Sequence, residues 1–144
     1  MRALLPARGS GLFSPIYVDD LVDAILLVCT HERAAGEVFN ITPDEAVTCA
    51  EFFGHYARML GKPPPRVAPT GVALVLAEVL SAFERLRGRR SELNRETVLY
   101  LTRPGGYSNA KARRLLGWRP TVDLAEGMRR TEQWLRERGL LGTT

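Results

Sequence analysis

Tyr107 and Lys111 are the pair of residues in this chain whose spacing most directly suggests chemistry. Residues four positions apart share a helix face, and an ammonium group beside a phenol lowers the phenol pKa, so that the tyrosine can transfer a proton. The tyrosine, however, follows Pro104-Gly105-Gly106, and Ser108 is predicted to cap the next helix. Tyr107 is therefore expected to lie outside that helix, and we interpret the pair as non-catalytic.

The cysteines and histidines do not indicate a metal site or a disulfide. Cys29 and Cys49 have neither C-x-x-C spacing nor a histidine at ligand spacing. His31 and His55 are far apart in the sequence and have no ligand-like neighbour. We expect both cysteines to be buried free thiols of a protein in a reducing compartment, and we expect no bound metal.

The composition is that of a soluble globular chain with a modest core, because 45% of its 144 residues are hydrophobic and 25% are charged. The net charge of +4 comes almost entirely from arginine. The densest arginine cluster comprises Arg85, Arg87, Arg89 and Arg90. It has no aromatic side chains nearby for base stacking, and the other arginines alternate with glutamates. We therefore expect solvated helix faces and no nucleic-acid partner.

No membrane span or signal peptide is predicted. The most apolar window, residues 71–80, is interrupted by Glu78 and is much shorter than the roughly 20 residues that a spanning helix needs. The first residues lack the charged and then apolar pattern of a secretory signal. We therefore expect a cytoplasmic protein.

Hydrophobic periodicity and capping signals predict two short strands and about six helices. The strands are predicted at Ser14–Val18 and Glu37–Thr42. Asp19 is predicted to cap the first helix, and Asp20 to favour its positive end. The other helices are predicted behind Thr48, at residues 70–87, behind Asn94, from Ser108 to Gly117, and behind Asp123. Two short strands rarely stand alone and usually extend another sheet, which indicates part of a larger fold.

Two stretches carry a resemblance to a known family. They are S-P-I-Y-V-D-D at 14–20 and R-P-G-G-Y-S-N-A-K-A-R-R-L-L-G-W-R-P at 103–120. In this order they resemble the C-terminal half of an extended short-chain dehydrogenase/reductase, the NAD-dependent epimerase/dehydratase family. The resemblance implies an α-rich α/β fold, the C-terminal lobe of a Rossmann-type enzyme, without its cofactor-binding half. Residues 1–12 are expected to be a loop or frayed end, 13–141 the substrate-binding region, and 142–144 a tail.

The resemblance also implies where a substrate would bind. The segment 14–20 is similar to the family's V-H-V-D-D signature, which lies at the edge of the substrate cleft, with Tyr17 in the usual histidine position. Members that act on nucleotide sugars carry a diphosphate-binding arginine where this chain has Phe13, and their R-P-G-D-like turn has Gly106 in place of the acid. The candidate substrate-binding residues are Phe13, Ser14, Pro15, Tyr17 and Arg103.

These departures make a nucleotide sugar a less expected substrate, because phenylalanine cannot pair with a phosphate. The apolar helix at 71–80 points to a sterol-like or isoprenoid-like hydroxyl or carbonyl compound, although the same pattern is typical of a helix buried in a protein core. Trp118 and Trp134 are expected to be packing anchors.

The complete enzyme would use NAD or NADP, but no cofactor site is expected in this chain, because it has no glycine-rich dinucleotide loop. Its expected partners are a missing N-terminal Rossmann half and a small-molecule substrate. The chain alone is not expected to transfer hydride. An apolar edge left by the missing half could promote self-association. The alternative is a free-standing, non-catalytic ligand-binding or interaction module derived from the same family.

Overall fold

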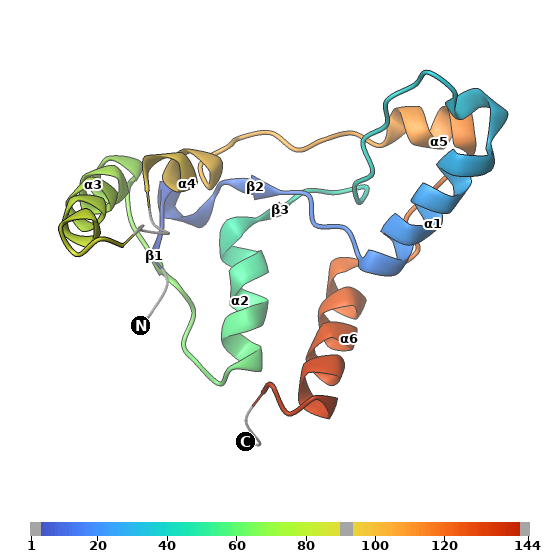
Figure 1. Ribbon diagram of the computed structural model, residues 1–144. Helices are drawn as coiled ribbons and strands as arrows, with labels where there is room; N and C mark the ends of the chain where they lie inside the picture. Colours follow the sequence, from blue (N-terminus) through green and yellow to red (C-terminus); the bar gives the residue numbers. More distant parts are fainter. Residues whose placement is uncertain (1–3, 90–93, 142–144) are drawn as a thin grey trace. The chain divides into compact units, whose positions relative to one another are not determined.

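The computed structural model of the chain describes residues 4–89 and 94–141 (Figure 1). The chain divides into two compact units, each built from two separate stretches of sequence. Unit 1 comprises the residues up to Phe13 together with Val47–Gly105, and unit 2 comprises Ser14–Ala46 and the residues from Gly106 onward. Arg90 of the predicted arginine cluster and the predicted tail at 142–144 lie outside the described residues.

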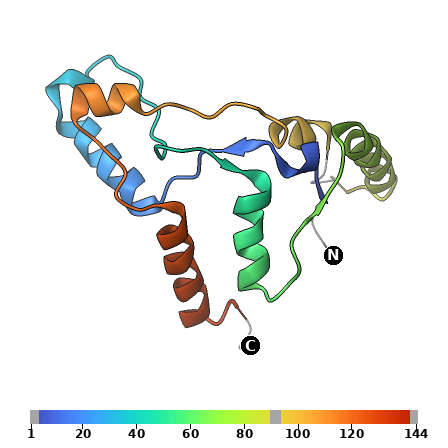
Figure 2. The same ribbon diagram turned by 180° about the vertical axis from the view of Figure 1, so that it is seen from behind.

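The strands lie in unit 1, where its described residues form two small sheets (Figure 2). Strand β1 (Leu4–Leu5) runs parallel to β4 (Arg66–Val67). Strand β2 (Leu12–Phe13) runs antiparallel to β3 (Val47–Thr48). Part of the segment 1–12, which we expected to be a loop or frayed end, is therefore ordered in β1 and in the 3-10 turn Ala7–Gly9, because residues distant in sequence supply its hydrogen bonds.

The helices of unit 1 begin where the local capping signals place them. Helix α2 (Cys49–Met59) begins after Thr48, whose Oγ1 accepts a hydrogen bond from the Glu51 amide at 3.2 Å. Helix α4 (Arg95–Tyr100) begins after Asn94, whose Oδ1 accepts one from the Thr97 amide at 2.8 Å. The predicted caps are confirmed at both positions.

The long helix α3 (Thr70–Leu86) packs one face on α4. Ala73 and Ala77 are buried there together with Val98 of α4. A second cluster joins Leu5, Cys49 and Leu101. Because these alanine side chains are small, the backbones of α3 and α4 can approach closely. The packing of unit 1 therefore uses the face of α3 that carries Ala73 and Ala77.

Unit 2 contains helices α1 (Val18–Thr30), α5 (Ala110–Leu116) and α6 (Leu124–Glu137), with a 3-10 turn at Glu32–Ala34. Helices α1 and α5 lie close together in both views (Figures 1 and 2). Their shared core consists of Ala24, Ala34, Ala112, Leu116 and Trp118. The packing role expected for Trp118 is confirmed, whereas Trp134 is half exposed, with the Arg138 guanidinium 4.8 Å from its ring centroid.

The ends of α5 and α6 follow from local signals. Gly117 ends α5 with φ +69°, a left-handed conformation that glycine adopts without strain. Asp123 Oδ1 accepts a hydrogen bond from the Glu126 amide at 2.8 Å and begins α6, as predicted. At α5 the prediction was one residue early, because Asn109 occupies the N-cap position, although Ser108 Oγ still accepts a hydrogen bond from the Ala110 amide at 3.2 Å.

Both strands predicted from sequence were wrong in position. The pairing of β2 ends at Phe13 and α1 begins at Val18, so Ser14–Val18 forms no strand. Glu37–Thr42 also forms none, because no other strand pairs with it among the described residues. Side chains satisfy two of its carbonyls instead: Lys111 Nζ donates to Val38 O at 2.9 Å, and Asn109 Nδ2 donates to Thr42 O at 3.0 Å.

Candidate functional site

Phe13 lies in a cluster of aromatic rings within unit 1. Its ring centroid is 5.2 Å from that of Phe52, 5.8 Å from Phe53 and 5.8 Å from Tyr100. Tyr56 extends the cluster through Phe52 at 5.4 Å. Most of these pairs have the edge-to-face geometry that aromatic rings prefer. The structure therefore surrounds the candidate residue Phe13 with apolar ring surface, which cannot neutralise a phosphate.

Arg103 places a cation beside this cluster. Its guanidinium lies 4.1 Å from the centroid of the Tyr100 ring, within the range of a cation–π contact. The Leu12 amide donates to Arg103 O at 2.8 Å, which ties the backbone of Arg103 to β2. The structure thus brings two candidate residues, Phe13 and Arg103, to the same aromatic cluster, which we call the Phe13 cluster.

Cys49 lies next to these elements and is not suited to nucleophilic chemistry. It is buried, and its Sγ donates to Leu101 O at 3.4 Å. Burial raises the pKa of the Cys49 thiol, because the thiolate would lose its hydration. The prediction of a buried thiol is confirmed for Cys49 and was wrong for Cys29, which is exposed on α1.

The remaining candidates, Ser14, Pro15 and Tyr17, lie in unit 2. Ser14 Oγ accepts a hydrogen bond from the Tyr107 amide at 3.4 Å, and Pro15 is partly buried. Tyr17 occupies the N-cap position of α1, which we had predicted for Asp19. Its ring packs against Gly127 of α6, where an added Cβ would lie 3.2 Å from Tyr17 Cδ2.

The packing around Gly106 explains why this chain lacks the acid of the R-P-G-D-like turn. A Cβ at this position would lie 2.8 Å from Ala46 Cβ and 3.4 Å from Ser14 Oγ. The first distance is too short for two carbon atoms, so residue 106 has no room for a side chain while Ala46 is present. An aspartate there would require the neighbouring backbone to move.

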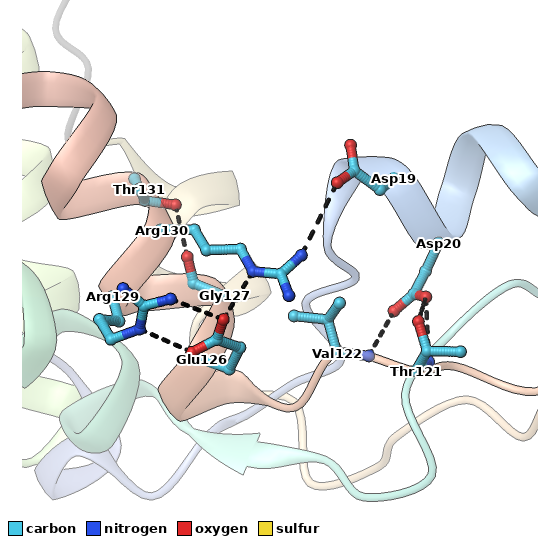
Figure 3. A network of polar contacts seen from close by, with 9 residues as sticks. All are labelled: Asp19, Asp20, Thr121, Val122, Glu126, Gly127, Arg129, Arg130 and Thr131. Carbon is cyan, nitrogen blue, oxygen red and sulfur yellow. Dashed lines mark hydrogen bonds and ion pairs between the residues drawn. The ribbon is translucent and has the colours of Figure 1, made fainter. Parts of the chain in front are cut away.

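Asp20 is a buried structural residue whose role was not predicted from sequence (Figure 3). It is 1% exposed, and its carboxylate accepts hydrogen bonds from Thr121 N at 2.9 Å, Thr121 Oγ1 at 2.7 Å and Val122 N at 3.0 Å. Burial by itself would raise the pKa of Asp20, but these hydrogen bonds and the charge of Arg130 outweigh burial and lower it. The ionised carboxylate therefore fastens α1 to the segment that leads into α6.

A second polar network joins the first turn of α6 to the start of α1 (Figure 3). Glu126 accepts hydrogen bonds from Arg129 and Arg130, which lower the pKa of Glu126 to about 2. Arg130 Nη1 also lies 3.9 Å from Asp19 Oδ2. The Arg130 guanidinium is 5.4 Å from the Tyr17 ring centroid, so the candidate Tyr17 is held between Gly127 and a cation.

The Tyr107–Lys111 pair is not arranged for proton transfer on a helix. Helix α5 begins at Ala110, so Tyr107 lies outside it, as predicted. Lys111 Nζ forms an ion pair with Glu37 Oε2 at 2.5 Å and donates to Val38 O. Lys111 is therefore a structural residue that holds the segment after α1.

Asn109 is another structural residue that sequence reasoning missed. It is buried, and its side-chain amide donates to Thr42 O at 3.0 Å and to Asp44 Oδ1 at 3.1 Å. Asp44 also forms an ion pair with Arg113 of α5. Both partners precede Asn109 by more than sixty positions, so no local signal indicated them.

The described residues do not fit a nicotinamide dinucleotide. A dinucleotide pyrophosphate binds at a helix N-terminus behind a glycine-rich turn, where negative side chains repel it. Acidic residues occupy the first turns of α1, α2, α4 and α6, and the Asp44 carboxylate lies beside Asn109 at the start of α5. Helix α3 follows Pro69 with no glycine-rich turn.

Residues 4–89 and 94–141 contain no group of three or more His, Cys, Asp or Glu side chains placed to hold a metal ion. No helix in this described part of the chain is long and apolar enough to cross a membrane.

The chain is similar to parts of longer known proteins. The chain is 35% identical over 117 residues to a 3-diazoavenalumate denitrifying reductase from a Streptomyces species, a match that covers 81% of this chain and 33% of the reductase. No protein-family model matches the chain. The chain spans between 33% and 42% of the length of the curated relatives it matches.

Solved structures are similar over almost the whole chain. An epimerase from Methanothermobacter thermautotrophicus matches with a TM-score of 0.65 and 23% identity, covering 94% of this chain and 33% of the epimerase. A dTDP-glucose 4,6-dehydratase from Streptomyces venezuelae, solved with NAD and TYD bound, matches with a TM-score of 0.62 and 24% identity, covering 96% and 35%. The chain therefore has the helix-rich α/β fold of the C-terminal portion of Rossmann-type short-chain dehydrogenase/reductase structures.

Proposed function

We propose that this chain is the substrate-binding portion of an NAD(P)-dependent oxidoreductase of the short-chain dehydrogenase/reductase type. The observation that carries the proposal is the 35% identity to a reductase across 81% of the chain, together with the shared fold. The cofactor would be bound by another stretch of polypeptide, because the described residues do not fit a dinucleotide. The complete enzyme would oxidise or reduce a small hydroxyl or carbonyl compound, and this chain alone would be inactive.

We expect a Rossmann half to contact unit 2 through an exposed apolar helix face. Val18, Val22, Ile25 and Leu26 lie on α1 and are 46 to 61% exposed. Their spacing puts them on one apolar helix face, and such exposed apolar faces mark interaction sites. The segment Glu37–Thr42 is rich in strand-forming residues, and Val38 within it is 82% exposed. We expect this segment to pair with a strand of the Rossmann sheet on assembly.

The Phe13 cluster supports a particular substrate class. Its ring surface suits an apolar ring compound, sterol-like or isoprenoid-like, which gains free energy by leaving water. Arg103 at the edge of the cluster can bind a polar or anionic group of such a compound. A nucleotide sugar fits less well, since Phe13 cannot pair with its diphosphate. In addition, the reductase relative is named for 3-diazoavenalumate rather than for a sugar nucleotide.

Ser14, Pro15 and Tyr17 are the candidate substrate-binding residues of unit 2. The hydroxyl groups of Ser14 and Tyr17 can donate hydrogen bonds to a substrate oxygen, and Pro15 supplies a stiff apolar contact between them. These roles are proposed for the complete enzyme, and all three residues belong to unit 2.

A chimera tests this proposal. The chain would replace the matching third of the 3-diazoavenalumate reductase. NADH oxidation would be followed with a panel of cyclic ketones, and conversion of UDP-glucose to its epimer would be followed with NAD⁺ present. We expect the chimera to reduce an apolar ketone and to leave UDP-glucose unchanged. A folded chimera that binds NADH but reduces none of the ketones, or that epimerises UDP-glucose, would contradict the proposed substrate class.

Two matched variants of the chimera test whether the substrate binds at the Phe13 cluster. Phe13→Ala removes the centre of the Phe13 cluster and should raise KM for the ketone about tenfold, because much of one ring contact is lost. Phe83→Ala makes the same change on α3, outside the cluster, and should leave KM unchanged. Equal effects of the two changes would count against a substrate at Phe13.

A further inference from the structure

Helix α3 presents a second apolar face that the packing of unit 1 does not use. The exposed side chains are Val72, Val75, Leu76, Val79, Phe83 and Leu86, which are between 37% and 88% exposed. At 100° per residue these six positions fall within one stripe about 100° wide that runs almost the full length of the helix. We call this surface the α3 stripe.

The stripe is not needed to hold α3 in place. Ala73 and Ala77 on the opposite side already pack with Val98 of α4. A solvent-facing helix side normally carries polar residues, and scattered single hydrophobic residues need no explanation, but six in one row do. The stripe therefore has the form of a binding surface.

Positive charge lies at the C-terminal end of the stripe. Arg85, Arg87 and Arg89 lie at or behind the last turn of α3. The Arg87 guanidinium is 4.0 Å from the centroid of the Phe83 ring, so one cation directly adjoins the apolar row. The prediction that no aromatic side chain lies near this arginine cluster was therefore wrong for Arg87. The acids of the helix, Glu78 and Glu84, lie outside the row on either side of it.

This charge pattern does not suit a second copy of the same helix. An antiparallel pair would bring the arginines of one copy against the positive N-terminal end of the other, where the first turn has no acid. A parallel pair would bring the two arginine groups together. Either arrangement sets like charges side by side, which opposes association.

We infer that the α3 stripe binds the surface of an anionic phospholipid bilayer, with the helix axis in the plane of the membrane. An interfacial helix combines an uncharged apolar face with basic residues that contact lipid headgroups, and α3 has both features. The apolar row would enter the acyl boundary, and the arginines at its C-terminal end would pair with phosphates. This inference goes beyond the proposed substrate-binding role and does not depend on it.

Vesicle binding of the full chain tests the inference. Cosedimentation would be measured with vesicles of phosphatidylglycerol and phosphatidylcholine, and with vesicles of phosphatidylcholine alone. We expect binding to the anionic vesicles that is at least tenfold tighter than to the neutral ones. Raising sodium chloride from about 0.1 M to about 0.5 M should weaken it, because salt screens the arginines. Equal binding to both vesicle types, or no binding to either, would overturn the inference.

Variants assign the binding to the stripe. Val75→Ser and Val79→Ser should each weaken vesicle binding about fivefold, because each removes one apolar side chain from the membrane contact. Val38→Ser makes the same change at an exposed position of unit 2 and should have no effect. Circular dichroism should show unchanged helix content in all three, since the substituted side chains are exposed. Vesicle binding that the Val75 and Val79 changes leave intact would refute the role of the stripe.

Sedimentation without lipid tests whether a second copy of the chain covers the α3 stripe instead. A monomer at micromolar concentration is expected for the wild-type chain. A dimer that Val79→Ser dissociates would show that a second copy covers the stripe, and would overturn the membrane assignment.

Discussion

Replacement of Asp20 by alanine should destabilise unit 2 more than any change at the surface of α1. The substitution removes the acceptor of three hydrogen bonds, which come from the Thr121 amide, the Thr121 hydroxyl and the Val122 amide. A buried donor left without a partner costs about 1 to 3 kcal/mol, and water can reach part of the opened site. We therefore expect Asp20→Ala to lower the free energy of unfolding by about 3 to 5 kcal/mol.

Tryptophan fluorescence during urea unfolding measures the change in unfolding free energy of unit 2. The chain has two tryptophans, Trp118 and Trp134, and both lie in unit 2. Asp23→Ala is the matched control, because Asp23 is exposed on the same helix. A change in unfolding free energy below about 1 kcal/mol for Asp20→Ala, or an equal loss for Asp23→Ala, would refute the assigned role of Asp20.

Milder variants keep the test informative where the alanine variant does not fold. Thr121→Val removes only the hydroxyl donor and should cost about 1 to 2 kcal/mol, whereas Thr121→Ser should cost less because it keeps the hydroxyl. Asp20→Asn keeps one acceptor oxygen but points an amide donor at another donor, so its cost should lie between those of Thr121→Val and Asp20→Ala.

The pH dependence of stability gives an independent signature of Asp20. Its pKa in the folded state is lowered below the value of about 3.9 in the unfolded chain, so the unfolded state binds the proton more readily. The stabilisation is therefore fully present above that unfolded value and is lost as the pH falls through the folded pKa. Asp20→Asn should flatten the unfolding free energy measured below about pH 4.

Two further predictions concern the cysteines and the glycine turn. Cys29 is exposed and should react with a thiol reagent at pH 8 at least about tenfold faster than Cys49, whose thiol is buried and has a raised pKa; Cys29→Ser should remove the fast phase. Gly106→Ala should lower unit 2 stability by about 1 to 3 kcal/mol, because its new Cβ would collide with Ala46. Ala46→Gly should restore part of that loss in the double variant, and an additive loss instead would show that the collision is not the cause.

The helix starts could be predicted from sequence because their signals are local. Thr48, Asn94 and Asp123 each accept a hydrogen bond from an amide three positions later, so a short window of sequence contains both partners. Two caps were misplaced. The cap of α5 differs by a single residue because Ser108 and Asn109 are both good capping residues. At α1 we predicted Asp19, but Tyr17 occupies the N-cap position without a side-chain cap hydrogen bond.

The strands could not be predicted because strand pairing depends on distant residues. Leu4–Leu5 has no strand pattern of its own and is ordered by Arg66–Val67. Glu37–Thr42 has a strong strand pattern but no strand beside it in the described residues. Strand propensity therefore identified a segment that would suit a sheet, while the described chain supplies no sheet for it.

The candidate site was predictable in part. The family resemblance singled out Phe13 and Arg103, but not the aromatic rings of α2 and α4 that surround them. Asp20 was interpreted as an ordinary helix-starting acid because its partner Thr121 lies 101 positions later in the chain. A buried carboxylate of this kind leaves no local pattern in the sequence.

Calorimetric titration of NADH into the isolated chain tests whether the cofactor binds to another stretch of polypeptide, as we propose. We expect no heat of binding at NADH concentrations up to the millimolar range, and micromolar binding only once the chain is joined to a Rossmann half in the chimera. Micromolar binding of NADH to the chain alone would contradict the account.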